Sequence, residues 1–136
     1  MVFEDEFMDK QSEIISMYND EINDNVKSIY LFIYNDESQF MMASAYKVND
    51  RVVGNLEAGV SDERDDEIYD VICEEIFPEL QEIHEKYNMP MPAEFRLTYN
   101  TVSGSFDAEY RYEKDIEAEE DYNCGITAQN WIDSLR

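Results

Sequence analysis

Histidine, glycine, proline and cysteine are scarce in this chain, and each shortage removes a class of function. The 136 residues include one His, four Gly, three Pro and two Cys. The glycines are scattered rather than gathered into the Gly-rich loop that cradles phosphates, so no nucleotide cofactor is indicated. His84 has no Cys or second His at metal-ligand spacing, so no metal site is predicted. His84 lies at the edge of an apolar helical face and is expected to be either a packed or a surface histidine.

The two cysteines give no sign of a disulfide framework or of a catalytic thiol. Cys73 and Cys124 are far apart in the sequence, without the density of a secreted disulfide scaffold, so both are expected to be reduced. Cys73 falls among apolar residues, and Cys124 follows an acidic run with no cation nearby to favour a thiolate. Paired carboxylates are too common here to identify an acid/base site. We therefore predict that the protein is not an enzyme and has no cofactor.

Positive charge is also in short supply. The chain contains ten Lys and Arg residues and 33 Asp and Glu residues, which gives a net charge of −23. Nucleic-acid phosphates and anionic membranes both require cations, so neither is an expected partner. No apolar run approaches the roughly 20 residues of a membrane span. The sequence begins MVFEDEFMDK, which is acidic where a signal peptide is basic, so a cytoplasmic location is expected.

Core-forming residues, by contrast, are plentiful. Hydrophobic residues make up 43% of the chain and aromatic residues 13%, far more than a disordered acidic tail contains. No composition shift marks a boundary, so residues 1–136 are expected to form a single domain. The size-scaling rule predicts a folded surface of about 7,400 Å².

Helical periodicity appears in three segments. Residues 3–22 have apolar side chains on one face and acids on the other, and residues 62–88 repeat this pattern. Pro78 interrupts the second segment, but its apolar face stays in phase, which favours a kink over two separate helices. A short final helix is predicted near Trp131, with Thr127 as its N-cap.

Strand patterns fill the remainder. Residues 27–34 and 39–48 form a predicted hairpin, followed by a third strand at 51–56. Residues 94–100 and 106–112 alternate cleanly and form a second hairpin. The order is α-βββ-α-ββ-α. We therefore predict an α+β fold with a mainly antiparallel sheet of about five strands and helices packed on one face.

The excess of acids is the strongest functional signal. A small domain needs a net charge of only about 2 to 8 to stay soluble, and a larger net charge opposes the compact state. The excess of acids therefore favours a role in attracting a cationic partner over solubility alone. Two acidic clusters are candidate contacts. The 62–66 cluster comprises Asp62, Glu63, Asp65 and Asp66, and the 117–121 cluster comprises Glu117, Glu119, Glu120 and Asp121. Tyr122 and Trp131 flank the second cluster and are candidate aromatic anchors, although core packing explains Trp131 equally well.

One stretch resembles a known family. The hairpin FRLTYN at 95–100, followed by SGSFDAEYRY at 103–112, is similar to the YezG-like antitoxin or immunity family. The resemblance implies a small cytoplasmic protein that binds and neutralises a bacterial toxin domain and has no catalysis of its own. It also implies that Phe106, Tyr110 and Tyr112 mainly determine the fold. Pro78 and the end of the last helix at Arg136 depart from the family's pattern.

Together these observations predict an immunity protein that occludes the active-site groove of a cognate basic toxin domain, expected to be a nuclease, in a heterodimer. Homo-oligomerisation is not indicated. A different hypothesis is an acidic nucleic-acid mimic that acts as an adaptor for an endogenous basic protein, which composition does not distinguish from the first. A third hypothesis, a carboxylate hydrolase or metal-dependent enzyme, requires several acids to converge in a pocket.

Overall fold

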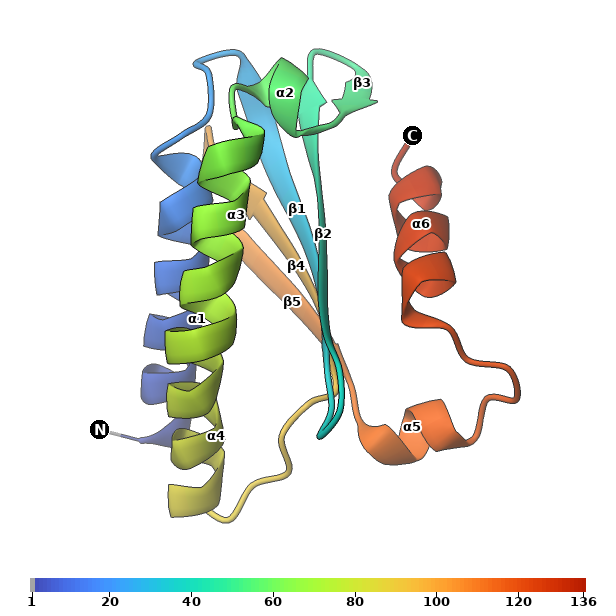
Figure 1. The fold of residues 1–136 in the computed structure, drawn as a ribbon. Coiled ribbons are helices and arrows are strands. Elements are labelled where there is room, and N and C mark those ends of the chain that lie inside the picture. The colour runs from blue at the N-terminus through green and yellow to red at the C-terminus, as the bar shows by residue number, and fades with distance from the viewer. Residues whose placement is uncertain (1) are drawn as a thin grey trace.

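A computed structural model describes residues 2–136, which adopt the predicted α+β fold (Figure 1). Its accessible surface is 7822 Å². The elements in chain order are α1 (Phe3–Asn19), β1 (Val26–Asn35), β2 (Phe40–Val48), β3 (Arg51–Val53), α2 (Asn55–Ala58), α3 (Asp62–Val71), the π-helical turn η1 (Ile72–Ile76), α4 (Phe77–Lys86), β4 (Glu94–Asn100), β5 (Phe106–Arg111), α5 (Glu113–Glu117) and α6 (Cys124–Ser134).

The sheet has five antiparallel strands in the order β3-β2-β1-β4-β5. Both predicted hairpins are present, and β1 lies at the centre because it joins them: Leu31 pairs with Ser44 on one side and Leu97 on the other. The third strand is shorter than predicted, since β3 ends at Val53 and α2 follows.

One face of the sheet is covered by α1 and by the helical run from α3 to α4 (Figure 1). Alternate strand residues such as Ile29, Leu31 and Ile33 point into this layer and are fully buried. They meet Ile14 from α1 and Ile68, Ile72 and Leu80 from the long helical run. Burial of these side chains is the main stabilising term of the fold.

The predicted interruption at Pro78 takes the form of the π-helical turn η1. Proline has no N–H to donate, and its ring clashes with the carbonyl four residues earlier, here that of Glu74. The wider turn spans residues 72–76 and ends two residues before Pro78, which lies in the first turn of α4. The helix therefore continues from α3 to α4 without dividing into two elements, and its apolar face stays on the sheet.

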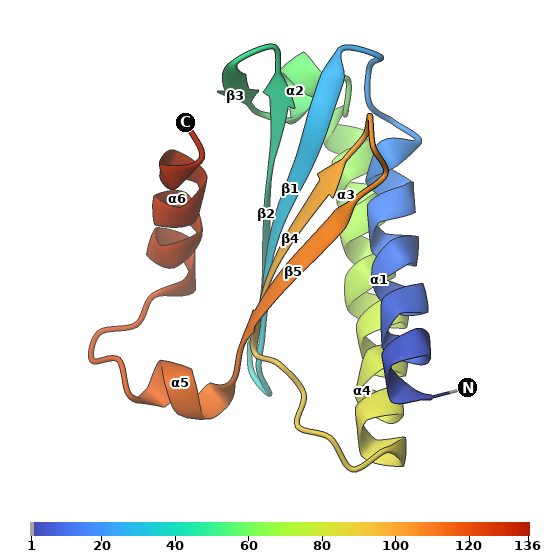
Figure 2. The ribbon, with the colours of Figure 1, turned by 180° about the vertical axis from the view of Figure 1, so that it is seen from behind.

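The final helix corrects the prediction that helices pack on one face only. Figures 1 and 2 show α6 on the side of the sheet opposite α1 and α4. The reason lies in β1, whose Tyr30, Phe32 and Tyr34 point to that side and are also buried. Ala128 and Ile132 of α6 cover these side chains, and they also cover the neighbouring residues of β2 on the same face. A strand that is apolar on both faces requires cover on both.

Several boundaries also differ from prediction. Helix α1 ends at Asn19 rather than near residue 22, and the short helix α5 was not predicted. The N-cap of α6 is Asn123, not Thr127, because the Asn123 side chain accepts a hydrogen bond from the Ile126 N–H at 3.0 Å. Within residues 2–136, no helix combines the length and apolar character needed to span a bilayer.

Candidate functional site

The 62–66 cluster forms the first turn of α3. Ser61 caps this helix by accepting a hydrogen bond from the Arg64 N–H at 3.1 Å. Asp62, Glu63 and Asp66 are exposed, and negative charge is favourable at this helix end. These three carboxylates are therefore presented to solvent from a rigid element.

Asp65 has a different environment from its neighbours in the cluster. It is partly buried and accepts a hydrogen bond from the Tyr18 hydroxyl of α1 at 3.1 Å. Burial raises the pKa of Asp65, and the nearby Asp66 and Asp62 carboxylates raise it further. Asp65 thus attaches α3 to α1, and it is less available to a partner than the three exposed acids.

The 117–121 cluster lies at the end of α5 and in the loop before α6. All four acids are exposed. Glu119 forms an ion pair with Arg111 of β5, and Asp121 has a positive φ of 60°. Asp tolerates this left-handed conformation better than most residues, so Asp121 has a role in the turn itself. Glu117 and Glu120 are the members without such a structural role.

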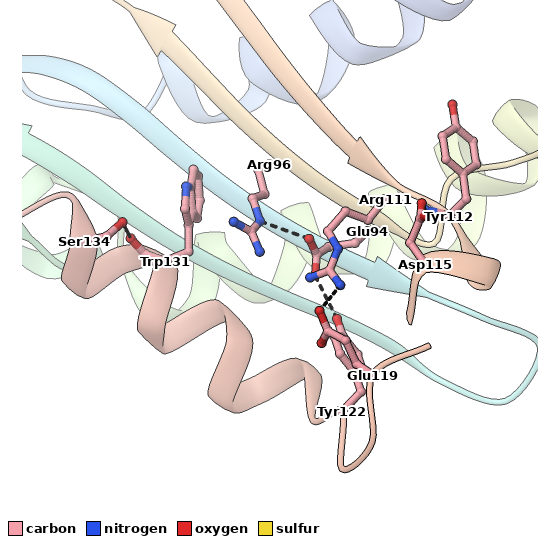
Figure 3. Close-up of polar contacts among 9 residues, drawn as sticks. All are labelled: Glu94, Arg96, Arg111, Tyr112, Asp115, Glu119, Tyr122, Trp131 and Ser134. Atoms are coloured by element: carbon pink, nitrogen blue, oxygen red, sulfur yellow. Dashed lines mark hydrogen bonds and ion pairs between the residues drawn. The ribbon is translucent and has the colours of Figure 1, made fainter. Parts of the chain in front are cut away.

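A buried carboxylate attaches this acidic loop to the sheet (Figure 3). Glu94 of β4 has a relative exposure of 0% and accepts hydrogen bonds from Arg96 Nε at 3.0 Å and from the Tyr122 hydroxyl at 2.9 Å. Arg111 Nη1 lies 3.7 Å from Glu94 Oε1. We call Glu94, Arg96, Arg111 and Tyr122 the Glu94 cluster. Two cations and a hydroxyl offset the desolvation of one buried anion.

Tyr122 and Trp131, the predicted aromatic anchors, both make contacts within the protein. The Tyr122 ring lies 5.6 Å from that of Tyr34, and burial together with the Glu94 carboxylate raises the pKa of its hydroxyl. Trp131 contacts Tyr30 and Phe32, with ring centroids 6.2 and 6.3 Å away. Both side chains are only partly exposed. Their principal contacts hold the 112–136 segment on the sheet.

The structure does not bring the two acidic clusters together. The start of α3 and the end of α5 lie at opposite ends of the molecule and on opposite sides of the sheet in both ribbon views (Figures 1 and 2). A standard interface covers about 800 Å² per partner. The clusters are therefore two separate candidate surfaces rather than one.

Most of the protein's cations are engaged in internal ion pairs, which makes the surface more uniformly negative. Lys10 pairs with Glu13 and Glu79, and Arg64 pairs with Glu21 and Glu67. Seven of the ten cations form such pairs within residues 2–136: Lys10, Arg51, Arg64, Lys86, Arg96, Arg111 and Arg136. A positively charged partner therefore meets cations that are mostly compensated by a neighbouring carboxylate.

Of the two environments expected for His84, packed or at the surface, the structure shows the packed one. His84 is 1% exposed, and its Nδ1 donates to the Leu80 carbonyl at 2.7 Å. The rings of Phe3 and Phe7 lie 4.9 and 4.8 Å from it. Burial lowers the pKa of His84, which favours the neutral ring. This environment is that of a structural histidine.

Two hollows are present on the surface formed by residues 2–136. One cavity of about 350 Å³ is lined by Tyr34, Gln39, Met41, Tyr122, Asn123, Cys124 and Gly125, with no Asp, Glu, His, Lys or Arg among them. A second, of about 400 Å³, includes Asp36, whose Oδ1 already accepts the N–H groups of Ser38 and Gln39. Over residues 2–136, no three or more His, Cys, Asp and Glu side chains are grouped to hold a metal ion.

Sequence reasoning did not identify Glu94 as a special residue. The alternation of polar and apolar residues correctly predicts that Glu94 lies on the polar face of β4. That face is not fully exposed in the structure, and Glu94 itself is buried. The available signal was the pairing of Glu94 with Arg96 on the same face of one strand. The burial itself depends on Tyr122 and on the loop from α5 to α6, which are distant in sequence.

Comparison with models of known protein families and with curated proteins finds no match to this sequence.

Proposed function

We propose that this protein is a cytoplasmic immunity protein that binds and neutralises a cognate basic toxin domain, a nuclease, in a one-to-one complex and without catalysis of its own. The observation that carries the proposal is a net charge of −23 on a 7822 Å² surface whose cations are largely held in internal ion pairs. The resemblance of the 95–112 hairpin to YezG-like immunity proteins supports the same function.

The physical argument concerns the toxin's own substrate. A nuclease needs a basic groove to hold phosphates, so its active site attracts a polyanion. An acidic protein can occupy that groove in place of the substrate, and steering by charge raises the association rate towards 10⁸ to 10⁹ M⁻¹s⁻¹ at low salt. Exposed acids on a rigid helix start, as in the 62–66 cluster, suit this role because they lose little conformational freedom on binding.

The test begins with recovery of the partner. The tagged protein is used to capture proteins from cells that encode it, at low and then moderate salt, with identification by mass spectrometry. The proposal predicts one basic domain whose toxic or nuclease activity falls on stoichiometric addition of this protein. If only abundant host proteins are recovered and these wash off with salt, the immunity function is contradicted and the adaptor function is favoured.

Charge reversal then assigns the surface. Three double variants change the net charge equally: Asp62→Lys with Asp66→Lys, Glu117→Lys with Glu120→Lys, and a control on the long helical run, Glu74→Lys with Glu82→Lys. All six acids are exposed. The variant that alters the interface is expected to slow association in stopped-flow measurements by at least about tenfold and to weaken its salt dependence. Equal effects of all three variants would exclude both clusters as specific contacts.

A further inference from the structure

The edge strand β5 has backbone hydrogen-bonding groups that no other strand uses. Among residues 2–136 it pairs with β4 only, and it lies at one edge of the sheet, as Figure 2 shows. At its two ends, the Asn100 N–H donates to the Ser105 carbonyl and the Ala93 N–H donates to the Arg111 carbonyl, both at 2.9 Å. Because backbone groups alternate in direction along a strand, the N–H and C=O groups of Phe106, Ala108 and Tyr110 face away from β4.

The two faces beside this edge differ in chemistry. Asp107 and Glu109 are exposed and lie on the α6 side of the sheet, where α6 covers β1 and β2 but not β5. Phe106, Ala108 and Tyr110 are half-buried on the other side and pack against the margin of the main core. A strand added to β5 would therefore have acids on one face and an apolar surface on the other.

We propose that β5 receives an extended segment of the protein partner as a sixth strand, in which Lys or Arg alternates with apolar residues. Cations at every second position would lie across from Asp107 and Glu109, and the apolar residues between them would extend the core past Phe106 and Tyr110. This inference rests on the proposed function only in taking the partner to be cationic.

Charge argues against a second copy of this chain as the occupant. An antiparallel pairing of two β5 strands centred on Ala108 would place Asp107 of one copy opposite Glu109 of the other. Like charges directly opposite one another destabilise strand pairing, and each chain carries a net charge of −23. The same two acids that oppose self-association select a basic strand.

The test uses two labelled peptides of equal composition, one alternating Lys and Val over eight residues and the other with four Lys followed by four Val. We expect the alternating peptide to bind at least tenfold more tightly in fluorescence anisotropy titrations. It should also slow amide hydrogen exchange at Phe106, Ala108 and Tyr110. Equal binding of the two peptides, or no protection of these amides, would overturn the proposal.

Two variants separate edge pairing from general attraction. Ala108→Pro removes an outward N–H, which an edge strand tolerates, and should reduce binding of the alternating peptide at least tenfold. Asp107→Lys with Glu109→Lys should do the same, whereas Glu74→Lys with Glu82→Lys, which changes net charge equally, should alter binding less than twofold. If Ala108→Pro fails to fold, the two charge variants decide. Because the probe is synthetic, failure here leaves the capture of a toxin unaffected.

Discussion

At the scale of single residues, Glu94 shows how one buried carboxylate holds two parts of the chain together. Arg96 is its neighbour on β4, whereas Arg111 lies on β5 and Tyr122 lies beyond α5. A buried ion pair does not by itself stabilise a fold, since desolvation offsets its attraction. Loss of the Glu94 carboxylate, however, leaves Arg96 without its ion-pair partner and Arg111 with Glu119 alone. The Glu94 cluster therefore determines where the acidic loop is attached more than it adds to total stability.

Removing the Tyr122 hydroxyl tests this role. Tyr122→Phe deprives the buried carboxylate of a 2.9 Å hydrogen bond and should lower the free energy of unfolding by about 1–3 kcal/mol in urea titrations. Glu94→Leu should cost about 3–5 kcal/mol, because Arg96 and Arg111 then lose their shared anion. Tyr99→Phe, at a partly exposed tyrosine of the same strand, is the matched control and should change stability by less than about 0.5 kcal/mol. A similar loss in all three variants would contradict the assignment.

At the scale of elements, α6 is attached differently from the other helices. The helices α1, α3 and α4 share one large core with the sheet, whereas α6 contacts two smaller clusters around Phe32 and Tyr30. Fewer buried contacts imply a lower local free energy of opening. The 112–136 segment, which carries the 117–121 cluster, is therefore expected to detach before the main core unfolds.

A charge placed beneath α6 should reveal this difference. Ala128 is 2% exposed and packs near Phe32, so Ala128→Asp would bury an unpaired carboxylate at a cost of about 3 kcal/mol or more. The fluorescence of Trp131, the chain's single tryptophan, should shift to longer wavelength while the circular dichroism of the sheet and long helices persists. Asn130→Asp adds the same charge at an exposed position and should leave the emission unchanged. Concerted loss of both signals would show that α6 is part of the main folding unit.

At the scale of the whole molecule, the net charge of −23 opposes the compact state that the core stabilises. The exposed ion pairs contribute little in return, since surface pairs are worth about 0–1 kcal/mol each. Salt screens both the ion pairs and the repulsion between acids. The repulsion is the larger effect, because 33 acids repel one another over long distances and only ten cations are present to neutralise them. Screening should therefore stabilise the protein, in contrast to a domain with balanced charge.

The salt dependence of thermal unfolding measures this balance. Raising ionic strength from about 0.01 to 0.15 M shortens the Debye length from about 30 to about 8 Å. We expect stability to rise by at least about 1 kcal/mol, which corresponds to an increase in Tm of about 4 °C for a domain of this size. The less negative variant Glu74→Lys with Glu82→Lys should show a smaller increase. A constant or falling Tm would mean that internal ion pairs outweigh the net repulsion.

The α+β class, the two hairpins and the amphipathic helices follow from local sequence patterns, because periods of 2 and 3.6 residues depend only on neighbouring positions. The alternation in EFRLTYN at 94–100, for example, predicted both ends of β4 correctly. The sequence also determined the net charge, and with it the class of partner that is favoured.

Three features emerge only from the packing of the whole chain: the side of the sheet that α6 covers, the burial of Glu94, and the separation of the 62–66 and 117–121 clusters. Each of these depends on contacts between segments distant in the chain, such as Tyr122 with Glu94 and Trp131 with Tyr30. Local patterns indicate that a residue is polar or aromatic, but burial depends on what packs over it. For the same reason, the free edge of β5 became visible only once the strand order was known.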